Sequence, residues 1–374
     1  MNRIYNLVWN TALHGWVVVP EIAKRSVRTS GKRCLVVGAV AAALGVTSSA
    51  FALDLHDEQL STATDFTPAF SAPLGVSSTL TGVTATTTGY GSEAVLVTGA
   101  GGFTDLSING GAYSTGGVNA GAVVANGVGA RIFLDADSRG STPQSVAIFT
   151  QGASSYGLLA DNGGVIQGSN VGILTLGDRT GTLSSMGAVA ENGGNLFLSN
   201  SRILTRGTYG VGLYGDTYGV VGMESGRIET NGANATGAGV FNHSDLFLSD
   251  TQIFTHGSSA RGVAVNGAST LTAQNTTIST QGASSHGVQL VDSGSSGSID
   301  GSTITTGGKG ATGILVSGGS IQIDNSSIET AGINSNGVTS AGTAGPSVVS
   351  ISDSSVQTHA DGSYGPRCKK WRQH

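Results

Sequence analysis

The sequence is poor in cysteine, proline and charge. Only 2 of its 374 residues are cysteine, 6 are proline, and charged residues make up 11%. So little charge excludes a coiled coil and is unusual for a helical enzyme. The 60 glycines follow no Gly-X-Y period, which excludes collagen. A hydrophobic share of 38% argues against a disordered chain. What is abundant, namely Gly, Ser, Thr and Val, is typical of an all-β protein.

The few charges are unevenly distributed along the chain. Residues 1–52 hold six basic side chains and one acid, Glu21, and residues 366–374 hold four more basic side chains. The segment between them, 53–365, has eight basic and 22 acidic residues, a net charge of −14. An acidic body has no electrostatic attraction for nucleic acid or for an anionic membrane surface. We therefore expect neither as a partner.

The N-terminal region has the pattern of an export signal. Residues 24–33 are basic, an apolar run of 12 extends from Leu35 to Val46, and Ala50-Phe51-Ala52 is a small-x-small cleavage pattern. Twelve residues are too few to cross a bilayer, which needs about 20. The pattern predicts cleavage after Ala52, and an uncleaved anchor helix is the alternative.

The cysteines agree with export. Cys34 lies inside the signal and Cys368 lies in the basic tail, so the segment 53–365 has none. A chain that is exported unfolded through a membrane pore would be blocked by a cross-linked loop. A repetitive β-stack that needs no disulfides is the other explanation, and the two are compatible.

The residues before this signal carry a second pattern. They read Met1-Asn-Arg-Ile-Tyr-Asn-Leu-Val-Trp-Asn10, then Gly15-Trp-Val-Val-Val19 and Glu21-Ile-Ala-Lys24. This stretch resembles the extended signal peptide region of Gram-negative type V secretion proteins. The segment 1–52 therefore divides into an extension, 1–23, and a Sec-type signal, 24–52. The resemblance implies the Sec translocon and periplasmic chaperones as export partners, but adhesins, proteases and two-partner exoproteins share it, so it indicates a route and no activity.

An Ile-x-Thr-x-Gly element repeats along the body. Its first residues step by 25, 30, 25, 25, 25, 26, 24 and 28. The nine first residues are Ile148, Ile173, Ile203, Ile228, Ile253, Ile278, Ile304, Ile328 and a degraded copy at Val356. A fixed spacing over nine copies indicates a repeat architecture.

Each repeat contains two further short strands. One begins with Gly, as at Gly157, Gly239, Gly262, Gly287, Gly313 and Gly337. The other alternates apolar residues, as in Leu196-Phe-Leu198, Leu246-Phe-Leu248, Leu271-Thr-Ala273 and Ile321-Gln-Ile323. Turn residues such as Asp161-Asn-Gly-Gly164 separate them, because Asn and Gly tolerate the positive φ of a sharp corner.

Three short strands and three corners in about 25 residues predict a parallel β-solenoid. The Ile residues would form one inward ladder, and the Thr residues from Thr150 to Thr358 a second, with Thr–Thr contacts between coils. We expect about ten coils over 106–365, with 53–105 as a lead-in or cap. Together with the leader, the repeat resembles a pertactin-like autotransporter passenger, which implies a right-handed parallel β-helix.

The tail departs from the repeat. After Gly365 the register requires an apolar strand, but the sequence reads Pro366-Arg-Cys-Lys-Lys-Trp-Arg-Gln-His374. Proline removes a ladder donor. We interpret 366–374 as an aberrant basic tail that follows a frameshift or premature stop, before the β-barrel translocator of the family. Its own or a separate outer-membrane barrel would then be required, and a truncated product would stay in the periplasm.

No segment has a convincing catalytic pattern. Asp292-Ser-Gly-Ser295 is the nearest to a serine-nucleophile motif, but it falls on a corner, and Val291 and Ser296 replace the flanking Gly and Pro of the protease motif. A turn is the preferred interpretation. Neither a Gly-x-Ser-x-Gly elbow nor a His-Glu-x-x-His motif is present in the sequence.

Histidines and basic residues give weak candidates for a site. His256 and His359 occupy the x of Thr-x-Gly several coils apart, and His286 precedes a strand Gly, so we expect solvent-facing side chains and no zinc site. A possible patch consists of Arg202, Arg206, Arg227 and Glu229, which could equally be a solvated edge. We assign no catalytic, metal or cofactor residue.

The sequence thus predicts an exported, non-enzymatic autotransporter passenger, an adhesin-type protein displayed at the cell surface or secreted. A host-cell or matrix receptor would be its partner. Two alternatives remain: a non-functional truncated remnant, and a carbohydrate-active β-helix enzyme.

Overall fold

A computed structural model of the protein describes residues 5–10, 15–20, 34–35, 52–181, 184–342 and 344–368. The chain divides into two units, 1–33 and 34–374. The first unit contains an antiparallel pair, β1 (Tyr5–Asn10) and β2 (Gly15–Pro20). The basic segment 24–33 and most of the apolar run, 36–46, lie outside the described residues. Cleavage after Ala52 therefore stays a prediction.

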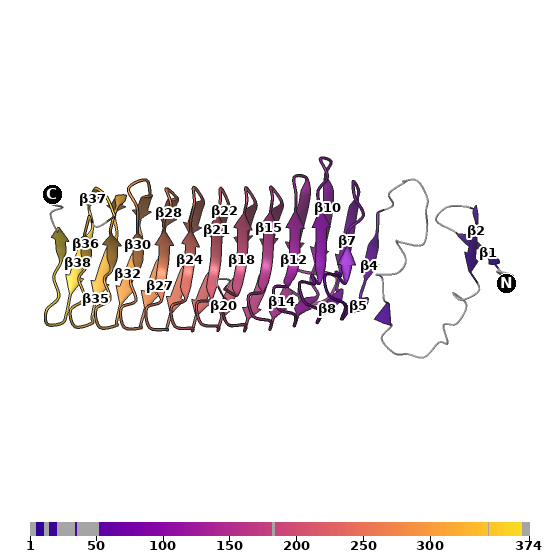
Figure 1. Ribbon diagram of the computed structural model, residues 1–374, viewed down its shortest axis with the longest axis horizontal. Helices are drawn as coiled ribbons and strands as arrows, with labels where there is room; N and C mark the ends of the chain where they lie inside the picture. The colour runs from indigo at the N-terminus through magenta and orange to yellow at the C-terminus, as the bar shows by residue number, and fades with distance from the viewer. Residues whose placement is uncertain are drawn as a thin grey trace. The chain divides into compact units, whose positions relative to one another are not determined.

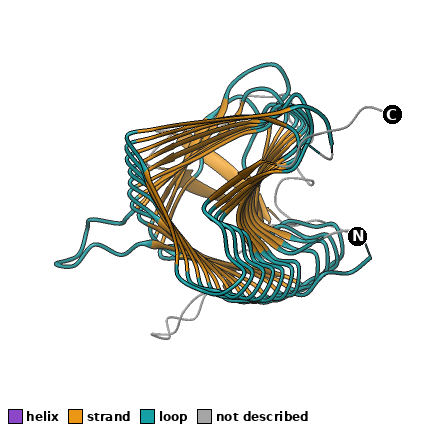
Figure 2. Cartoon of the chain, turned by 90° about the vertical axis from the view of Figure 1, so that its left-hand side faces the viewer, coloured by secondary structure: helices purple, strands orange, loops and turns teal. Residues whose placement is uncertain are grey.

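The second unit is a parallel β-solenoid (Figures 1 and 2). Within its described part every regular element is a strand, and from β4 onward each strand pairs in parallel with the strand three places further along the chain. The three strands of a coil thus enter three sheets, numbered I, II and III in the order in which a coil visits them. Figure 2 looks along the stack and shows the loops gathered at the corners between the sheets.

The strands of each sheet follow in sequence order. Sheet I contains β4 (Asp54–His56), β7 (Ser77–Thr81), β10 (Thr104–Asn109), β13 (Ala130–Asp135), β16 (Val165–Ser169), β19 (Asn195–Ser199), β22 (Val220–Glu224), β25 (Asp245–Ser249), β28 (Thr270–Gln274), β31 (Ser296–Asp300), β34 (Gly319–Asp324) and β37 (Ser347–Ser352). Sheet II contains β3 (Cys34–Leu35), β5 (Gln59–Thr62), β8 (Thr84–Thr87), β11 (Ala112–Thr115), β14 (Val146–Thr150), β17 (Val171–Thr175), β20 (Arg202–Thr205), β23 (Arg227–Thr230), β26 (Gln252–Thr255), β29 (Thr277–Thr280), β32 (Thr303–Thr306), β35 (Ser327–Thr330) and β38 (Ser355–Thr358). Sheet III contains β6 (Phe70–Ser71), β9 (Val95–Thr98), β12 (Gly121–Asn126), β15 (Tyr156–Asp161), β18 (Met186–Glu191), β21 (Val211–Asp216), β24 (Thr236–Val240), β27 (Arg261–Val265), β30 (Val288–Leu290), β33 (Ile314–Val316), β36 (Val338–Ser340) and β39 (Pro366–Cys368).

The solenoid predicted from the repeat is confirmed, and it is longer than the ten coils expected over 106–365. The three sheets have 12, 13 and 12 strands among the described residues. The additional coils come from 54–98, whose strands β4 to β9 pair in register with the repeat. At the other end, Pro366–Cys368 pairs with β36 as a strand of sheet III, while 369–374 lie outside the described residues. A capping role for 53–105 stays a prediction.

The predicted Ile ladder forms the core of sheet II. The eight Ile residues of the repeat are each no more than 3% exposed, and consecutive members are direct register partners. The glycine that closes each Ile-x-Thr-x-Gly element also forms a ladder. A Cβ built on Gly232 would lie 1.9 Å from the carbonyl oxygen of Gly207, its counterpart one coil earlier. This glycine is therefore required by the close approach of two backbones.

The recurring glycine of the sheet III strands has a different function. The prediction that Gly239 belongs to this series is wrong. The register pairs Gly239 with Tyr214, so the member of this series is Gly237, two residues earlier. A Cβ on Gly237 would lie 2.3 Å from Cγ2 of Ile253, which shows that the inward Ile of the next coil packs on the glycine. The error arose because Gly237-Ala-Gly239 places two glycines on one face at the period of a strand.

The corner predictions are confirmed. Asn162 and Gly163, in the turn between sheets III and I, have φ of 52° and 82°, as expected for Asn-Gly at a sharp corner. Between sheets I and II one left-handed residue makes the turn, as at Asn200 and Asp250. Short polar side chains tolerate that conformation, which explains why Asn and Asp recur there.

The Thr ladder is buried from Thr150 to Thr330 and partly buried at Thr358, but its buried hydroxyls do not pair from coil to coil. Thr280, Thr306 and Thr330 each donate to the carbonyl five residues further along the chain, at 2.7–3.0 Å. The hydroxyls of five others have no hydrogen-bond partner among the described residues: Thr150, Thr175, Thr205, Thr230 and Thr255. For three of them the sheet III ladder takes up the carbonyl five residues further along: Met186 N donates to Ser155 O, Thr236 N to Gly210 O and Arg261 N to Ala235 O.

This difference predicts opposite effects of one substitution. Thr205→Val removes an unpaired buried hydroxyl and should stabilise the protein by about 1 kcal/mol, because an unsatisfied polar group carries an uncompensated desolvation cost. Thr306→Val removes a hydroxyl that donates to Ala311 O at 3.0 Å, and should destabilise by about 1 kcal/mol. Thermal unfolding followed by circular dichroism measures both, and shifts of equal sign would contradict the assignment.

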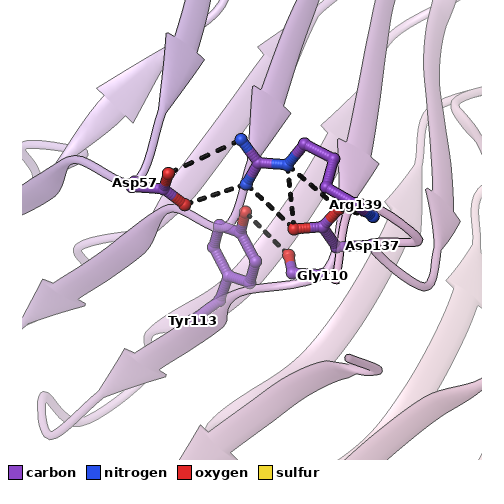
Figure 3. Close-up of polar contacts among 5 residues, drawn as sticks. All are labelled: Asp57, Gly110, Tyr113, Asp137 and Arg139. Atoms are coloured by element: carbon purple, nitrogen blue, oxygen red, sulfur yellow. Dashed lines mark hydrogen bonds and ion pairs between the residues drawn. The ribbon is translucent and has the colours of Figure 1, made fainter. Parts of the chain in front are cut away.

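A set of polar contacts joins the first four coils at the corner between sheets I and II (Figure 3). Arg139, in the loop 136–145, contacts Asp137 at 2.9 Å and reaches back to Asp57 at 2.8 Å. Gly82 lies beneath this bridge, since a Cβ there would meet both Asp57 and Arg139. Tyr113 is buried next to it and donates to Gly110 O at 3.4 Å. Through these contacts the loop 136–145 reaches back over the irregular coils that precede it.

Candidate functional site

The outward face of sheet I carries a groove that crosses seven coils, from β10 to β28. Its volume is about 670 Å³. Alternation within each strand turns every second side chain outward, and the parallel register places these side chains in rows along the stack. The groove is thus built from two neighbouring rows, one of which forms its floor and the other a side wall.

The floor contains exposed aromatic rings on every second coil. Phe133, Phe197 and Phe247 are 36%, 40% and 42% exposed and are separated along the row by Gln167 and Gly222. Rings of this size are normally buried, so a row of them on a solvated face marks a contact surface.

Gly222 makes two of these rings into one platform. A Cβ built on Gly222 would lie 2.6 Å from Cδ1 of Phe197, so the ring covers the glycine. The Phe197 and Phe247 rings are stacked, with centroids 6.5 Å apart and an angle of 30° between their planes. Any larger side chain at position 222 would push the Phe197 ring away and divide the platform.

The wall beside the floor is polar. Seven residues at the ends of the strands line it, one from each coil: Asn109, Asp135, Ser169, Ser199, Glu224, Ser249 and Gln274. Asp135 accepts hydrogen bonds from the amide of Ala136 and from Asn170, whereas Glu224 has no hydrogen-bond or ion-pair partner among the described residues. No lysine or arginine lines the groove within the part of the chain that the structure describes. The site is therefore apolar and aromatic below, and hydroxylic and acidic at the side.

The patch suspected from sequence forms in part, on sheet II. Glu229 accepts from Arg202 at 3.3 Å and from Arg227 at 3.1 Å, and its other oxygen lies 3.6 Å from His256. Burial alone would raise the pKa of Glu229, but the Arg227 hydrogen bond and the charges of Arg227, His256 and Arg202 lower it. Arg206 is exposed and does not join the cluster. Both arginines share the single carboxylate of Glu229, which is largely covered, so the cluster offers no open site.

Two of the three histidines, His256 and His359, are exposed as predicted, whereas His286 is not. His256 bonds Gln281 at 2.9 Å beside Glu229, and His359 lies 2.9 Å from Glu329 on a half-exposed edge. His286 is partly buried, and its Nδ1 accepts from the Thr312 amide at 3.0 Å. Burial and the nearby Arg261 lower the pKa of His286, so it is a neutral structural residue and the solvent-facing assignment is wrong for it.

The segment Asp292-Ser-Gly-Ser295 is a corner. Asp292 has φ of 79°, its carboxylate accepts from Gly267 N, and the buried Ser295 hydroxyl donates to Val291 O at 2.8 Å.

The described residues contain no group of three metal-ligating side chains that could hold an ion. Nor do they include a helix with the length and apolar character needed to cross a membrane.

A column of carboxylates lies on sheet III. Asp161, Glu191 and Asp216 are register partners on three successive coils. Asp161 accepts from Asn162 and Asn192, and Asp216 from Tyr214 and Asn242, whereas Glu191 is half-buried between them. Burial, followed by the charges of Asp161 and Asp216, raises the pKa of Glu191.

Neutralising Glu191 should stabilise the protein at pH 7. A raised folded-state pKa means that folding favours the protonated form, so stability is lost as pH rises from about 4.3, the ordinary value for Glu. Each like charge directly opposite Glu191 lowers the stability of the protein by about 0.2–1 kcal/mol. Glu191→Gln should therefore raise stability by about 1 kcal/mol at pH 7 and leave it unchanged below pH ~4. Glu224→Gln is the control, because Ser199 and Ser249 are its register partners. An equal gain in both variants in a pH series of thermal melts would contradict the role of the column.

The body of the chain is a parallel β-solenoid, and it follows a leader with the pattern of an export signal. Residues 1–50 match the sequence family described as the extended signal peptide of the type V secretion system, which confirms the prediction made from the leader residues. No curated protein sequence matches the chain significantly.

A solved structure shows a similar fold. The solenoid is similar to a chain in the cryo-EM structure of the Vag8–C1 inhibitor complex, with a TM-score of 0.62 and 16% identity over 83% of this chain and 73% of that one. The A-module of the Azotobacter vinelandii mannuronan C-5 epimerase AlgE4 matches at a TM-score of 0.36 and 13% identity, over 79% of this chain and 91% of that one. The leader and the likeness to Vag8 support the type V autotransporter passenger that the sequence resembles.

Proposed function

We propose that this passenger acts outside the cytoplasm by binding rather than by catalysis, as an adhesin-type protein displayed at the cell surface or released from it. The groove on sheet I is the observation that carries the proposal, because it exposes three aromatic rings over a rigid stack of coils. Binding sites are concave and aromatic with a few polar groups at their edge, and the groove has this composition.

Two further findings support the proposal. The extended signal peptide supports export through the Sec translocon and an outer-membrane translocator, and periplasmic chaperones would be further partners on this route. The similar solenoid of Vag8 was solved in complex with C1 inhibitor, so a passenger of this fold binds a protein partner. A partner on a host cell or in its matrix would fit such a role.

The experiment compares bacteria that express the chain with bacteria that express Phe197→Ala/Phe247→Ala. An antibody against the solenoid first establishes equal display or release, and attachment to host-cell layers is then counted. We expect attachment to require the chain and to fall in the double variant. Attachment that is unchanged when the whole gene is removed would exclude the adhesin function. Turnover of a polysaccharide that is lost on mutating Arg202 and Glu229 would instead indicate the enzyme alternative.

A further inference from the structure

We propose that the groove on sheet I binds an uncharged glycan chain, with sugar rings stacked on the Phe197–Phe247 platform. The inference rests on the proposed function, since it names the kind of partner that the groove takes. It is carried by three properties of the groove: its floor, its wall and its length.

The floor suits the apolar face of a sugar ring. The face of an aromatic ring is electron-rich and attracts weakly positive C–H groups. A pyranose presents such C–H groups on one face and hydroxyls around its rim. The Phe197 and Phe247 rings offer a joint aromatic surface, and Phe133 offers another at the same row two coils before Phe197. A wholly apolar ligand would form no hydrogen bonds with the polar wall beside these rings.

The wall suits the hydroxyl rim of the same ligand. Ser169, Ser199 and Ser249 present hydroxyls beside the floor, and the Glu224 carboxylate, which lacks a partner among the described residues, accepts hydrogen bonds. Asp135 adds a second carboxylate to the same row. Two acids without a lining cation repel uronate, sialate or sulfate groups, which selects a neutral or N-acetylated sugar over an anionic one.

The length of the groove favours a polymer. Six coil spacings of about 4.8 Å make the groove about 29 Å long. The two phenylalanines of the platform start from coils about 9.6 Å apart, but their rings lean together, with centroids 6.5 Å apart. The groove is much longer than one sugar ring, so a chain of several sugars fills it better than a monosaccharide.

The test is isothermal titration of the purified protein with chitohexaose and cellohexaose, and with polygalacturonate as the anionic counterpart. We expect binding of a neutral hexasaccharide and none of the polyanion. Phe197→Ala and Phe247→Ala should each weaken binding about tenfold, the loss seen when a central aromatic anchor is truncated. Gly222→Ala should also weaken it, because its Cβ would displace the Phe197 ring without removing a ring. Phe66→Ala, which removes an exposed ring outside the groove, should leave affinity unchanged.

The outcomes separate this inference from the proposed function. Failure of both neutral hexasaccharides to bind, or affinity unchanged in the Phe197 and Phe247 variants, overturns the glycan assignment. If those variants nevertheless reduce bacterial attachment, the adhesin function stands and a peptide or protein surface occupies the groove. Glycan binding by the purified protein, with no effect of the gene on attachment, would overturn the adhesin function alone.

Discussion

Replacing Gly232 by alanine is expected to prevent the solenoid from folding as one stack. The new Cβ would lie 1.9 Å from the carbonyl oxygen of Gly207, 2.5 Å from its carbonyl carbon and 2.9 Å from the Thr208 nitrogen. All three are backbone atoms, so no rotamer change relieves the overlap. The coils would have to separate where their hydrogen bonds hold them about 4.8 Å apart.

Gly232→Ala should lower the free energy of unfolding by about 4 kcal/mol or more. Losses this large are exceptional and arise from severe packing defects of this kind. Urea unfolding of the purified protein measures it, and accumulation in inclusion bodies would be the extreme result. Gly172→Ala is the matched control, because the nearest atom to its Cβ is Val146 O at 4.0 Å and its φ is not positive. That variant should change stability by less than about 0.5 kcal/mol. Equal stability of the two variants would show that the glycine ladder is not a steric requirement.

The sequence predicts the coils well because each coil repeats the same contacts. Ile228, Thr230 and Gly232 recur one coil later as Ile253, Thr255 and Gly257, so the spacing alone aligns the ladder. The reason for the glycine is not visible in the spacing, since it depends on how closely two backbones approach. The sheet III register was predicted less well, because Gly237 and Gly239 share one face and only packing against Ile253 distinguishes them.

The groove could have been found in part from sequence. The segments Leu196-Phe-Leu198 and Leu246-Phe-Leu248 already place a large aromatic between two inward leucines, which puts the ring on the outer face. What sequence could not supply is Phe133 in the same row, because the steps of 34 residues to Gln167 and 30 residues to Phe197 depart from the regular 25 and hide the alignment. The Glu229–His256 contact was also missed, since it joins neighbouring coils diagonally across different positions of the repeat.

Truncating one inward isoleucine in the middle of the stack is expected to weaken the protein locally rather than everywhere. Ile253 is fully buried between Ile228 and Ile278 on the ladder, and its Cγ2 fills the space above Gly237. Ile253→Ala removes this contact and leaves a cavity that rigid neighbouring backbones cannot close, at a cost of about 2–5 kcal/mol. Ile253→Val keeps the branch and should cost about 0.5–1.5 kcal/mol.

The control for Ile253→Ala is the adjacent residue on the opposite face. Phe254 is larger but only partly buried, and its ring lies under the Arg227 guanidinium at 4.3 Å. Phe254→Ala should therefore cost less than Ile253→Ala, about 1 kcal/mol, despite removing more atoms. Because each coil contacts only its neighbours, hydrogen exchange in Ile253→Ala should increase around β23, β26 and β29 and leave β11 and β35 protected. A uniform increase along the whole chain would instead show that the solenoid unfolds as a single cooperative unit.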